Sequence, residues 1–237
     1  MSNLHPSFGP FSRPQVVGSI SSLSQLPSPE QLTEQCDIVE FRLDGMVHEK
    51  TNDLANALEC TAQVLPILIT ARCQEEGGLE ELSPQQRSSL LERFLDFASW
   101  VDIEVNSAQS MESILKTIQT KQKKLILSSH NFQTTPPPSS LRKIFTQASD
   151  LGADIAKIAI QHNTLSDLHS CAHLMQDHFP TPVSMMGMGP LAPVSRVLFS
   201  QLGSVLNYGF LGNEATAPGQ WSASLLKKAI LNSQIIA

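Results

Sequence analysis

The chain has 237 residues, of which 41% are hydrophobic and only 5% aromatic, so its core must be built from aliphatic side chains. The formal net charge of −6 argues against a surface that binds nucleic acid or anionic membranes. No stretch approaches the roughly 18 apolar residues of a membrane span, so we expect neither nucleic acid nor a membrane as a partner.

Short apolar segments alternate along the chain with segments typical of helices. Residues 1–14 are rich in proline and are predicted to form an N-terminal arm, and residues 15–237 a single domain. The segments predicted as strands are 16–20, 37–44, 66–72, 100–105, 124–130, the run within 152–160, 182–186 and 205–210. Helices are predicted over 25–35, 51–60, 83–98, a segment ending near 119, 141–151, 163–178 and a segment that follows Pro218.

Eight strands that alternate with about eight helices predict a parallel sheet, and eight repeats allow it to close into a (β/α)8 TIM barrel. The alternative is an open, doubly wound sheet. The GxGxxG turn that usually follows the first strand of such a sheet is absent here, since Gly18-Ser-Ile does not replace it.

Polar side chains interrupt these strands near their carboxyl ends, where an enclosed strand should be apolar. Because the carboxyl ends of barrel strands meet at one mouth, these side chains are expected around one cavity. The alternative is a structural ion network among Glu40, Arg42, Arg72 and Glu104. The polar positions are Glu40, Arg42, Asp44, Arg72, Glu76, Asp102, Glu104, His130 and, within the sixth strand, Lys157.

Lys157 lies in the middle of the apolar run Gly152-Ala-Asp-Ile-Ala-Lys-Ile-Ala-Ile160. A lysine on an edge strand, with its stem packed and its ammonium in water, would explain that position. A lysine inside an apolar wall instead loses its proton more easily and becomes an amine that can attack a ketone. The sequence around Lys157 leaves both interpretations open.

Blocks along most of the chain together resemble the type I 3-dehydroquinate dehydratases of the shikimate pathway. Each block alone is weak, but their order and spacing are specific. The blocks are Glu40-Phe-Arg42-Leu-Asp44, Thr70-Ala-Arg72 with Glu76-Gly-Gly78, Asp102-Ile-Glu104, Ser129-His130-Asn-Phe132 with Thr135-Pro136, Gly152 to Ala159, Met186-Gly187, Gly189, Ser195-Arg196, Gly203-Ser204 and Ala217-Pro218-Gly219-Gln220.

The resemblance implies that Lys157 forms an iminium with the C3 ketone of 3-dehydroquinate. His130 would then take the C2 proton and return it to the departing C1 hydroxyl, a syn elimination of water that gives 3-dehydroshikimate. Glu76 would orient His130, and Arg196, which we assign to the loop after the seventh strand, would bind the substrate carboxylate. The resemblance assigns the remaining substrate contacts to Glu40, Arg42, Arg72, Thr216 and Gln220.

The chain departs from the family at a few positions. Thr216 replaces a serine that usually lies four residues before the glutamine, and Thr216 keeps the hydroxyl but restricts χ1. Ser129 precedes His130 where the family often has tyrosine. These changes affect the local geometry and leave the reacting groups in place.

Two other functions are compatible with a lysine in a barrel wall. A class I aldolase also uses such a lysine, but usually with a glycine-rich phosphate site after the last strands, where this chain has Arg196. A binding domain that has lost activity would not need both Lys157 and His130. We therefore expect an enzyme that uses no cofactor.

We expect no metal site, because His169 and His173 share a helix face with no third ligand in the pattern. The four cysteines have no CxxC spacing, and the first residues do not resemble a secretory signal, so reduced thiols in a cytoplasmic protein are expected. The resemblance also favours a homodimer.

Overall fold

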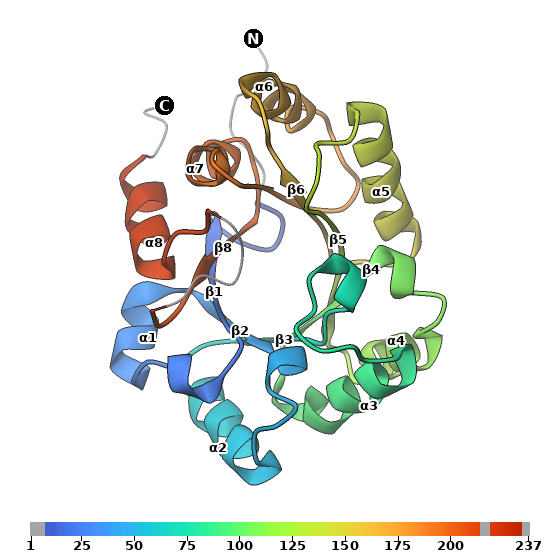
Figure 1. Ribbon diagram of the computed structural model, residues 1–237, viewed down its shortest axis with the longest axis vertical. Helices are drawn as coiled ribbons and strands as arrows, with labels where there is room; N and C mark the ends of the chain where they lie inside the picture. Colours follow the sequence, from blue (N-terminus) through green and yellow to red (C-terminus); the bar gives the residue numbers. More distant parts are fainter. Residues whose placement is uncertain (1–7, 214–218, 234–237) are drawn as a thin grey trace.

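The computed structural model of the protein describes residues 8–213 and 219–233. The strands form a ring around a central axis and the helices lie outside it (Figure 1). The strands are β1 (Gln15–Ile20), β2 (Ile38–Arg42), β3 (Ile67–Thr70), β4 (Trp100–Glu104), β5 (Lys124–Asn131), β6 (Ile155–Gln161), β7 (Val183–Met188) and β8 (Leu206–Phe210).

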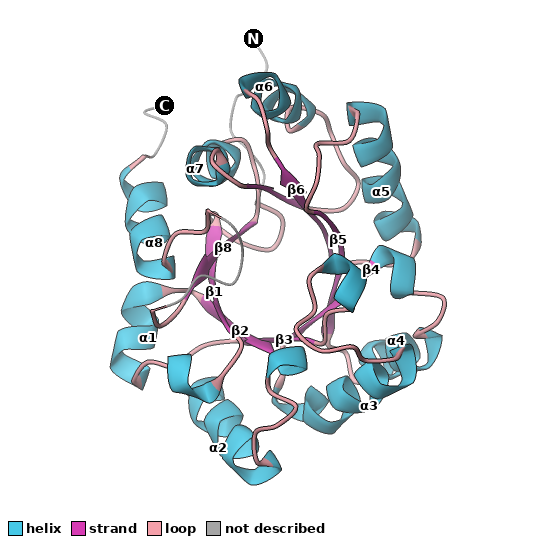
Figure 2. Ribbon diagram, in the orientation of Figure 1, coloured by secondary structure: helices cyan, strands magenta, loops and turns pink. Residues whose placement is uncertain are grey.

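A helix follows each of these strands, so the ring of strands has an outer layer of helices (Figure 2). The (β/α)8 architecture is therefore confirmed and the open sheet is excluded. The helices are α1 (Pro29–Gln35), α2 (Thr51–Ala62), α3 (Pro84–Phe94), α4 (Glu112–Thr120), α5 (Pro138–Asp150), α6 (Leu165–Leu174), α7 (Ala192–Gln201) and α8 (Ala223–Asn232).

The barrel is nearly closed. Backbone ladders join the strands, all parallel, in the order β7-β6-β5-β4-β3-β2-β1-β8. Side-chain hydroxyls supplement the contact between β7 and β8. Ser204 accepts a hydrogen bond from the Met185 backbone N–H at 3.0 Å, and Ser184 donates one to the Leu206 carbonyl at 2.6 Å. These two serines replace part of the backbone pairing that would otherwise close the ring.

Strand alternation decides which residues face the interior. On β6, Ala156, Ile158 and Ile160 pack into the core between the strands and the helices, whereas Ile155 and Ala159 belong to the smaller cluster inside the ring. Lys157 lies two residues from both Ile155 and Ala159, so its side chain points to the same face of the strand and enters the barrel. The interpretation of Lys157 as an edge-strand lysine is therefore wrong.

The described part of the N-terminal segment packs against the amino-terminal end of the barrel. Phe8 and Phe11 contact the inner cluster there, and the Phe11 ring lies 5.8 Å from the Trp100 ring, centre to centre. Because Ile38, Leu68 and Trp100 near the starts of their strands belong to the same cluster, this end is filled by apolar side chains. Polar groups therefore concentrate at the opposite, carboxyl-terminal end.

Several predicted segments differ from the structure. The strand predicted over 37–44 ends at Arg42, and Leu43–Gly45 form a 3₁₀ turn. The helix predicted over 25–35 is a single 3₁₀ turn, Leu23–Gln25, followed by α1 from Pro29. Pro27 and Pro29 lack the N–H groups that a continuous helix needs, and the Ser28 side chain caps the new start.

The segment that holds Arg196 was predicted as a loop and is helix α7 instead. Pro193 lies in its first turn, and its buried residues recur at helical spacing: Ala192, Ser195, Arg196, Phe199 and Ser200. Three of these five are polar, and for that reason the pattern does not look like an apolar stripe.

No helix in residues 8–213 and 219–233 is long and apolar enough to cross a membrane. The four cysteines are unpaired. Burial raises the pKa of the Cys36 and Cys171 thiols to about 12, so neither thiol is ionised near neutral pH.

We expect Ser204→Ala to lower the free energy of unfolding by about 1–3 kcal/mol, because it leaves the buried Met185 N–H without its acceptor. Denaturation in urea measures the change. Ser200→Ala is the matched control, since Ser200 is equally buried but its hydroxyl bonds only within its own helix, where it donates to the Val197 carbonyl and accepts from the Gln201 side chain. An equal loss in both variants would contradict a specific role for Ser204 in closing the barrel.

Candidate active site

A cavity opens at the carboxyl ends of the strands. The parallel barrel brings together side chains that are far apart in the sequence, from Ser19 to Gln220. Eight of the nine predicted site residues line it: Glu40, Arg42, Arg72, Glu76, His130, Lys157, Arg196 and Gln220. The ninth, Thr216, lies outside the described residues.

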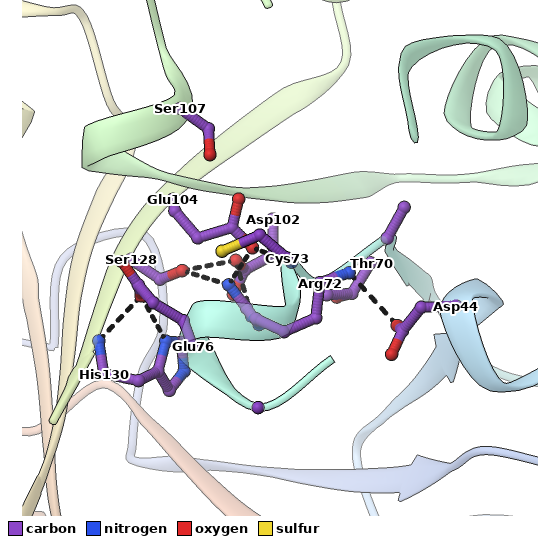
Figure 3. A network of polar contacts seen from close by, with 12 residues as sticks. Asp44, Thr70, Arg72, Cys73, Glu76, Asp102, Glu104, Ser107, Ser128 and His130 are labelled. Atoms are coloured by element: carbon purple, nitrogen blue, oxygen red, sulfur yellow. Dashed lines mark hydrogen bonds and ion pairs between the residues drawn. The ribbon is translucent and has the colours of Figure 1, made fainter. Parts of the chain in front are cut away.

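Arg72 is the centre of the polar network below the cavity (Figure 3). Its guanidinium is 2% exposed and donates to Glu104 at 2.9 Å, Ser128 at 2.7 Å and Asp102 at 2.8 Å. Burial disfavours its charge, but Asp102 and Glu104 outweigh burial and hold the pKa of Arg72 above its ordinary value. Arg72 is thus a permanent positive charge beneath the site.

A second buried arginine, Arg87 of α3, completes this network. It donates to Glu104 at 2.5 Å and to Ser107 at 2.9 Å. Glu104 also accepts from the Cys73 backbone N–H, so it connects β4 to the loop that follows β3. Burial favours the neutral acid, but Arg72 and Arg87 together lower the pKa of Glu104. The ion network predicted as an alternative to a functional site therefore exists in part, as the support of the cavity floor.

Lys157 lies between an acid and an aromatic ring. Its amine donates to Asp102 at 2.8 Å and stands 4.0 Å from the centre of the Tyr208 ring. The Lys157 side chain is 4% exposed, and burial lowers its pKa; Asp102 opposes this shift and Arg72 adds to it. Asp102 itself stays ionised, because Arg72 and Lys157 outweigh the burial that would raise its pKa. Lys157 can therefore lose its proton more easily than a lysine in water.

His130 is held by Glu76 through two contacts to the same carboxylate oxygen. The His130 backbone N–H donates to Glu76 Oε2 at 2.8 Å, and its ring Nδ1 lies 2.9 Å from that oxygen. Burial lowers the pKa of His130 well below its ordinary value, and Arg72 and Lys157 lower it further. A neutral ring with its proton on Nδ1 donates to Glu76 and leaves Nε2 free to accept a proton.

Glu76 reaches His130 because its loop turns sharply. It ends the short helix η3 (Gln74–Glu76), and Gly77 follows at φ +89°, a conformation that favours glycine. A Cβ at Gly78 would meet the Arg72 carbonyl at 2.5 Å, so the chain there approaches too closely for any side chain. Burial raises the pKa of Glu76 to about 7, although Arg72 opposes the rise.

Glu40 and Arg42 form the wall on β2. The two Glu40 oxygens accept hydrogen bonds from Ser19 at 2.5 Å and Thr70 at 2.7 Å. Arg42 forms a bidentate pair with Asp44 and donates to the Gly77 carbonyl at 2.9 Å. Arg42 thereby ties the end of β2 to the loop that holds Glu76.

Arg196 enters the cavity from α7 and is 1% exposed. One of its guanidinium nitrogens donates to the Tyr208 carbonyl, and its Nε has no hydrogen-bond partner. Among the described residues no carboxylate forms an ion pair with it. Burial lowers the pKa of Arg196 to about 10, which still leaves it charged at neutral pH. It is a buried cation in the cavity wall without a carboxylate partner among the described residues.

The chain matches known proteins along most of its length. A family model described as type I 3-dehydroquinase matches residues 20–236. The chain belongs to the type I 3-dehydroquinase family. The 3-dehydroquinate dehydratase of Methanococcoides burtonii is 31% identical over 221 residues, covering 92% of this chain and 94% of the relative. The one from Lactiplantibacillus plantarum is 34% identical over 200 residues, covering 80% and 79%. The protein is thus a hydro-lyase of this family.

Solved structures of the family share its fold. The 3-dehydroquinate dehydratase of Aquifex aeolicus has a TM-score of 0.78 at 26% identity and covers 92% of this chain and 98% of that chain. The type I enzyme from Clostridium difficile has a TM-score of 0.81 and covers 94% and 92%; at 22% identity it supports the fold alone.

Three side chains of this dehydroquinase site were not predicted as site residues. Asp102 contacts Lys157; it was expected among the polar residues around the cavity but was given no role in the reaction. Ser128 donates to Asp102 at 2.6 Å, and its position two residues before His130 on β5 would have placed it on the same face. Tyr208 lies within the strand Leu206–Phe210. This strand has no charged residue, so its sequence provided no indication of a functional position.

We expect Glu76→Gln to stabilise this dehydroquinase more at high pH than at low pH. The folded-state pKa of Glu76 is raised to about 7. Between pH about 4.5, where the carboxyl ionises in the unfolded chain, and pH about 7, where it ionises in the folded protein, the free energy of unfolding falls as the pH rises. Glutamine does not ionise, so the variant lacks this fall. The difference in unfolding free energy between variant and wild type should be about 2 kcal/mol larger near pH ~8 than near pH ~5.

Urea denaturation at the two pH values measures this effect. Glu75→Gln is the matched control, because Glu75 is the exposed neighbour of Glu76 in the same short helix. A stability difference that does not change with pH in Glu76→Gln would show that burial does not perturb this carboxyl.

Proposed function

We propose that the protein is a 3-dehydroquinate dehydratase that eliminates water from 3-dehydroquinate through a Schiff base on Lys157. The main support is a single arrangement: the buried Lys157 amine shares one cavity with His130 and with Arg196. A nucleophile, an acid–base group and a carboxylate-binding cation are the three groups that this elimination requires.

The reaction begins with attack of the Lys157 amine on the C3 ketone. The C–N bond forms, and the carbonyl oxygen leaves as water with one hydrogen of the amine and one proton taken up from solution. The remaining amine hydrogen stays on the protonated imine. Asp102, which contacts the Lys157 nitrogen at 2.8 Å, stabilises this positive charge. The iminium is a better acceptor for electrons than the ketone, so the neighbouring C2 proton becomes acidic.

His130 then removes the C2 proton, and the electron pair of that C–H bond moves into the iminium to give an enamine. The enamine returns its electrons as the C1–O bond breaks, and the hydroxyl leaves as water with the proton that His130 carries. Glu76 stabilises the transient imidazolium and keeps Nε2 available. Hydrolysis of the remaining protonated imine consumes one water and releases 3-dehydroshikimate, the free lysine amine and the proton taken up in the first step.

Arg196 binds the carboxylate of the substrate in this proposal, because a guanidinium can donate two parallel hydrogen bonds to a carboxylate. Glu40, Arg42, Arg72 and Gln220 hold the ring hydroxyls and the local charge balance. Thr216, outside the described residues, is proposed as a further contact. Met186 and Met188 line the cavity and provide an apolar surface for the substrate ring.

We propose that this reaction serves the shikimate pathway of aromatic amino acid biosynthesis in the cytoplasm and that the chain acts as a homodimer. These proposals rest on the family resemblance. Sedimentation of the purified protein at several concentrations tests the dimer independently of activity.

Lys157→Ala should reduce turnover at least about a thousandfold, since the covalent route is lost. Borohydride reduction of the wild type during turnover, followed by peptide mass mapping, should place the substrate adduct on Lys157. Lys124→Ala is the control, because Lys124 is an exposed lysine paired with Asp154. An adduct on another residue, or none during turnover, would rule out the mechanism.

His130→Ala should still form the borohydride-trapped adduct but lose about 10²- to 10⁴-fold in the elimination rate, because proton transfer is removed. Steady-state kinetics and adduct trapping on the same preparation separate the two steps. His169→Ala, at an exposed position on α6, serves as the control. Full activity of the His130 variant would refute its acid–base role.

A further inference from the structure

Tyr208 is the single tyrosine of the chain and lies on β8, next to Lys157. It is 4% exposed, and the Lys157 amine stands 4.0 Å from the centre of its ring. The face of an aromatic ring attracts a cation, so this contact stabilises the charged forms of the nitrogen. The stabilising contact depends only on the aromatic ring, so phenylalanine at this position would provide it as well.

The hydroxyl of Tyr208 is not explained by this contact. It is buried and has no hydrogen-bond partner among the described residues. Buried hydroxyl groups are almost always paired, because leaving one unpaired costs the lost hydration. Tyr208 also lines the cavity that holds Lys157, Glu40 and Arg196. An unpaired donor in the wall of a binding cavity indicates a partner on the ligand.

The nearby carboxylates already have other donors. Both oxygens of Glu40 accept from Ser19 and Thr70. Asp102 accepts from Arg72, Ser128 and Lys157. Burial, with Glu40 and Asp102, raises the pKa of Tyr208 well above its ordinary value, so the phenol keeps its proton and can only donate or accept as a neutral group.

We propose, on the basis of the function proposed above, that the Tyr208 hydroxyl donates a hydrogen bond to the oxygen of the carbonyl group that Lys157 attacks. The ring that carries the hydroxyl also contacts the attacking nitrogen. The carbonyl carbon must come within bonding distance of that nitrogen, so its oxygen is brought to the same end of the cavity as the phenol.

The hydrogen bond strengthens as the reaction proceeds. When the C–N bond forms, the carbonyl π electrons move to the oxygen, and a donor at that position stabilises the developing negative charge. Tyr208 transfers no proton in this step. The oxygen still departs as water with one amine hydrogen and one proton from solution, and Tyr208 only positions and polarises the group. Its effect is therefore on imine formation rather than on removal of the C2 proton.

Tyr208→Phe tests the hydroxyl alone, because it keeps the ring beneath Lys157. Rapid mixing with 3-dehydroquinate and quenching with borohydride measures how fast the Lys157 adduct forms. We expect that rate to fall about threefold to tenfold, the effect of one neutral hydrogen bond. The melting temperature should be unchanged or higher, since no bond within the protein is lost. An adduct that forms at the wild-type rate, or a lower melting temperature, would overturn the proposal.

Two further measurements make the test independent of one variant. Tyr208→Leu also removes the ring and should slow adduct formation more than Tyr208→Phe does, because the contact with the Lys157 amine is lost as well. A wild-type rate in Tyr208→Phe together with a slow Tyr208→Leu would show that only the ring acts and would overturn the role of the hydroxyl. The tyrosine absorption, taken as the difference between wild type and Tyr208→Phe because two tryptophans absorb in the same range, should shift when substrate binds, and an unchanged difference spectrum would also overturn the proposal. A wild type that turns over and forms the Lys157 adduct, with no effect of Tyr208→Phe, removes this inference and leaves the proposed function intact.

Discussion

The site depends on one buried carboxylate, Asp102, which lies between two cations. One oxygen accepts from Arg72 and Ser128, and the other accepts from Lys157 at 2.8 Å. Charged groups inside a protein persist only when paired, and a buried carboxylate without these partners would be protonated. Because Asp102 stays ionised, it fixes the direction of the Lys157 side chain and opposes the effect of burial on its pKa. The amine is thus held in place and yet loses its proton more easily than a free lysine.

Most charges around Asp102 are balanced. Arg72, Arg87 and Lys157 contact the carboxylates Asp102 and Glu104, and Glu40 adds a third carboxylate to the same cavity. Arg196, in contrast, forms no ion pair with a carboxylate among the described residues. An unpaired buried cation of this kind favours an anionic ligand.

Several groups in the cavity are arranged at the expense of stability. The pKa of Glu76 is raised to about 7, and Arg196 Nε and the Tyr208 hydroxyl are buried without partners. A perturbed buried carboxyl and buried polar groups without hydrogen-bond partners each destabilise the folded protein, so they are rare in a protein core. They occur together at the mouth of the barrel, while the opposite end is filled by apolar side chains such as Phe11 and Trp100. This division separates the part of the fold that provides stability from the part that is open to a ligand.

The sequence by itself determined the barrel and most of the charged site, because strand and helix periods are local and the carboxyl ends of parallel strands must converge. Glu40, Arg72, His130 and Lys157 were predicted at one mouth on that ground. The helical position of Arg196 was missed because its polar neighbours concealed the helical period. The choice of Asp102 as the partner of Lys157, and of Tyr208 as its aromatic neighbour, depended on the tertiary structure. These contacts join β4, β6 and β8, and the distance between side chains on separate strands is set by how the barrel closes, which no local pattern encodes.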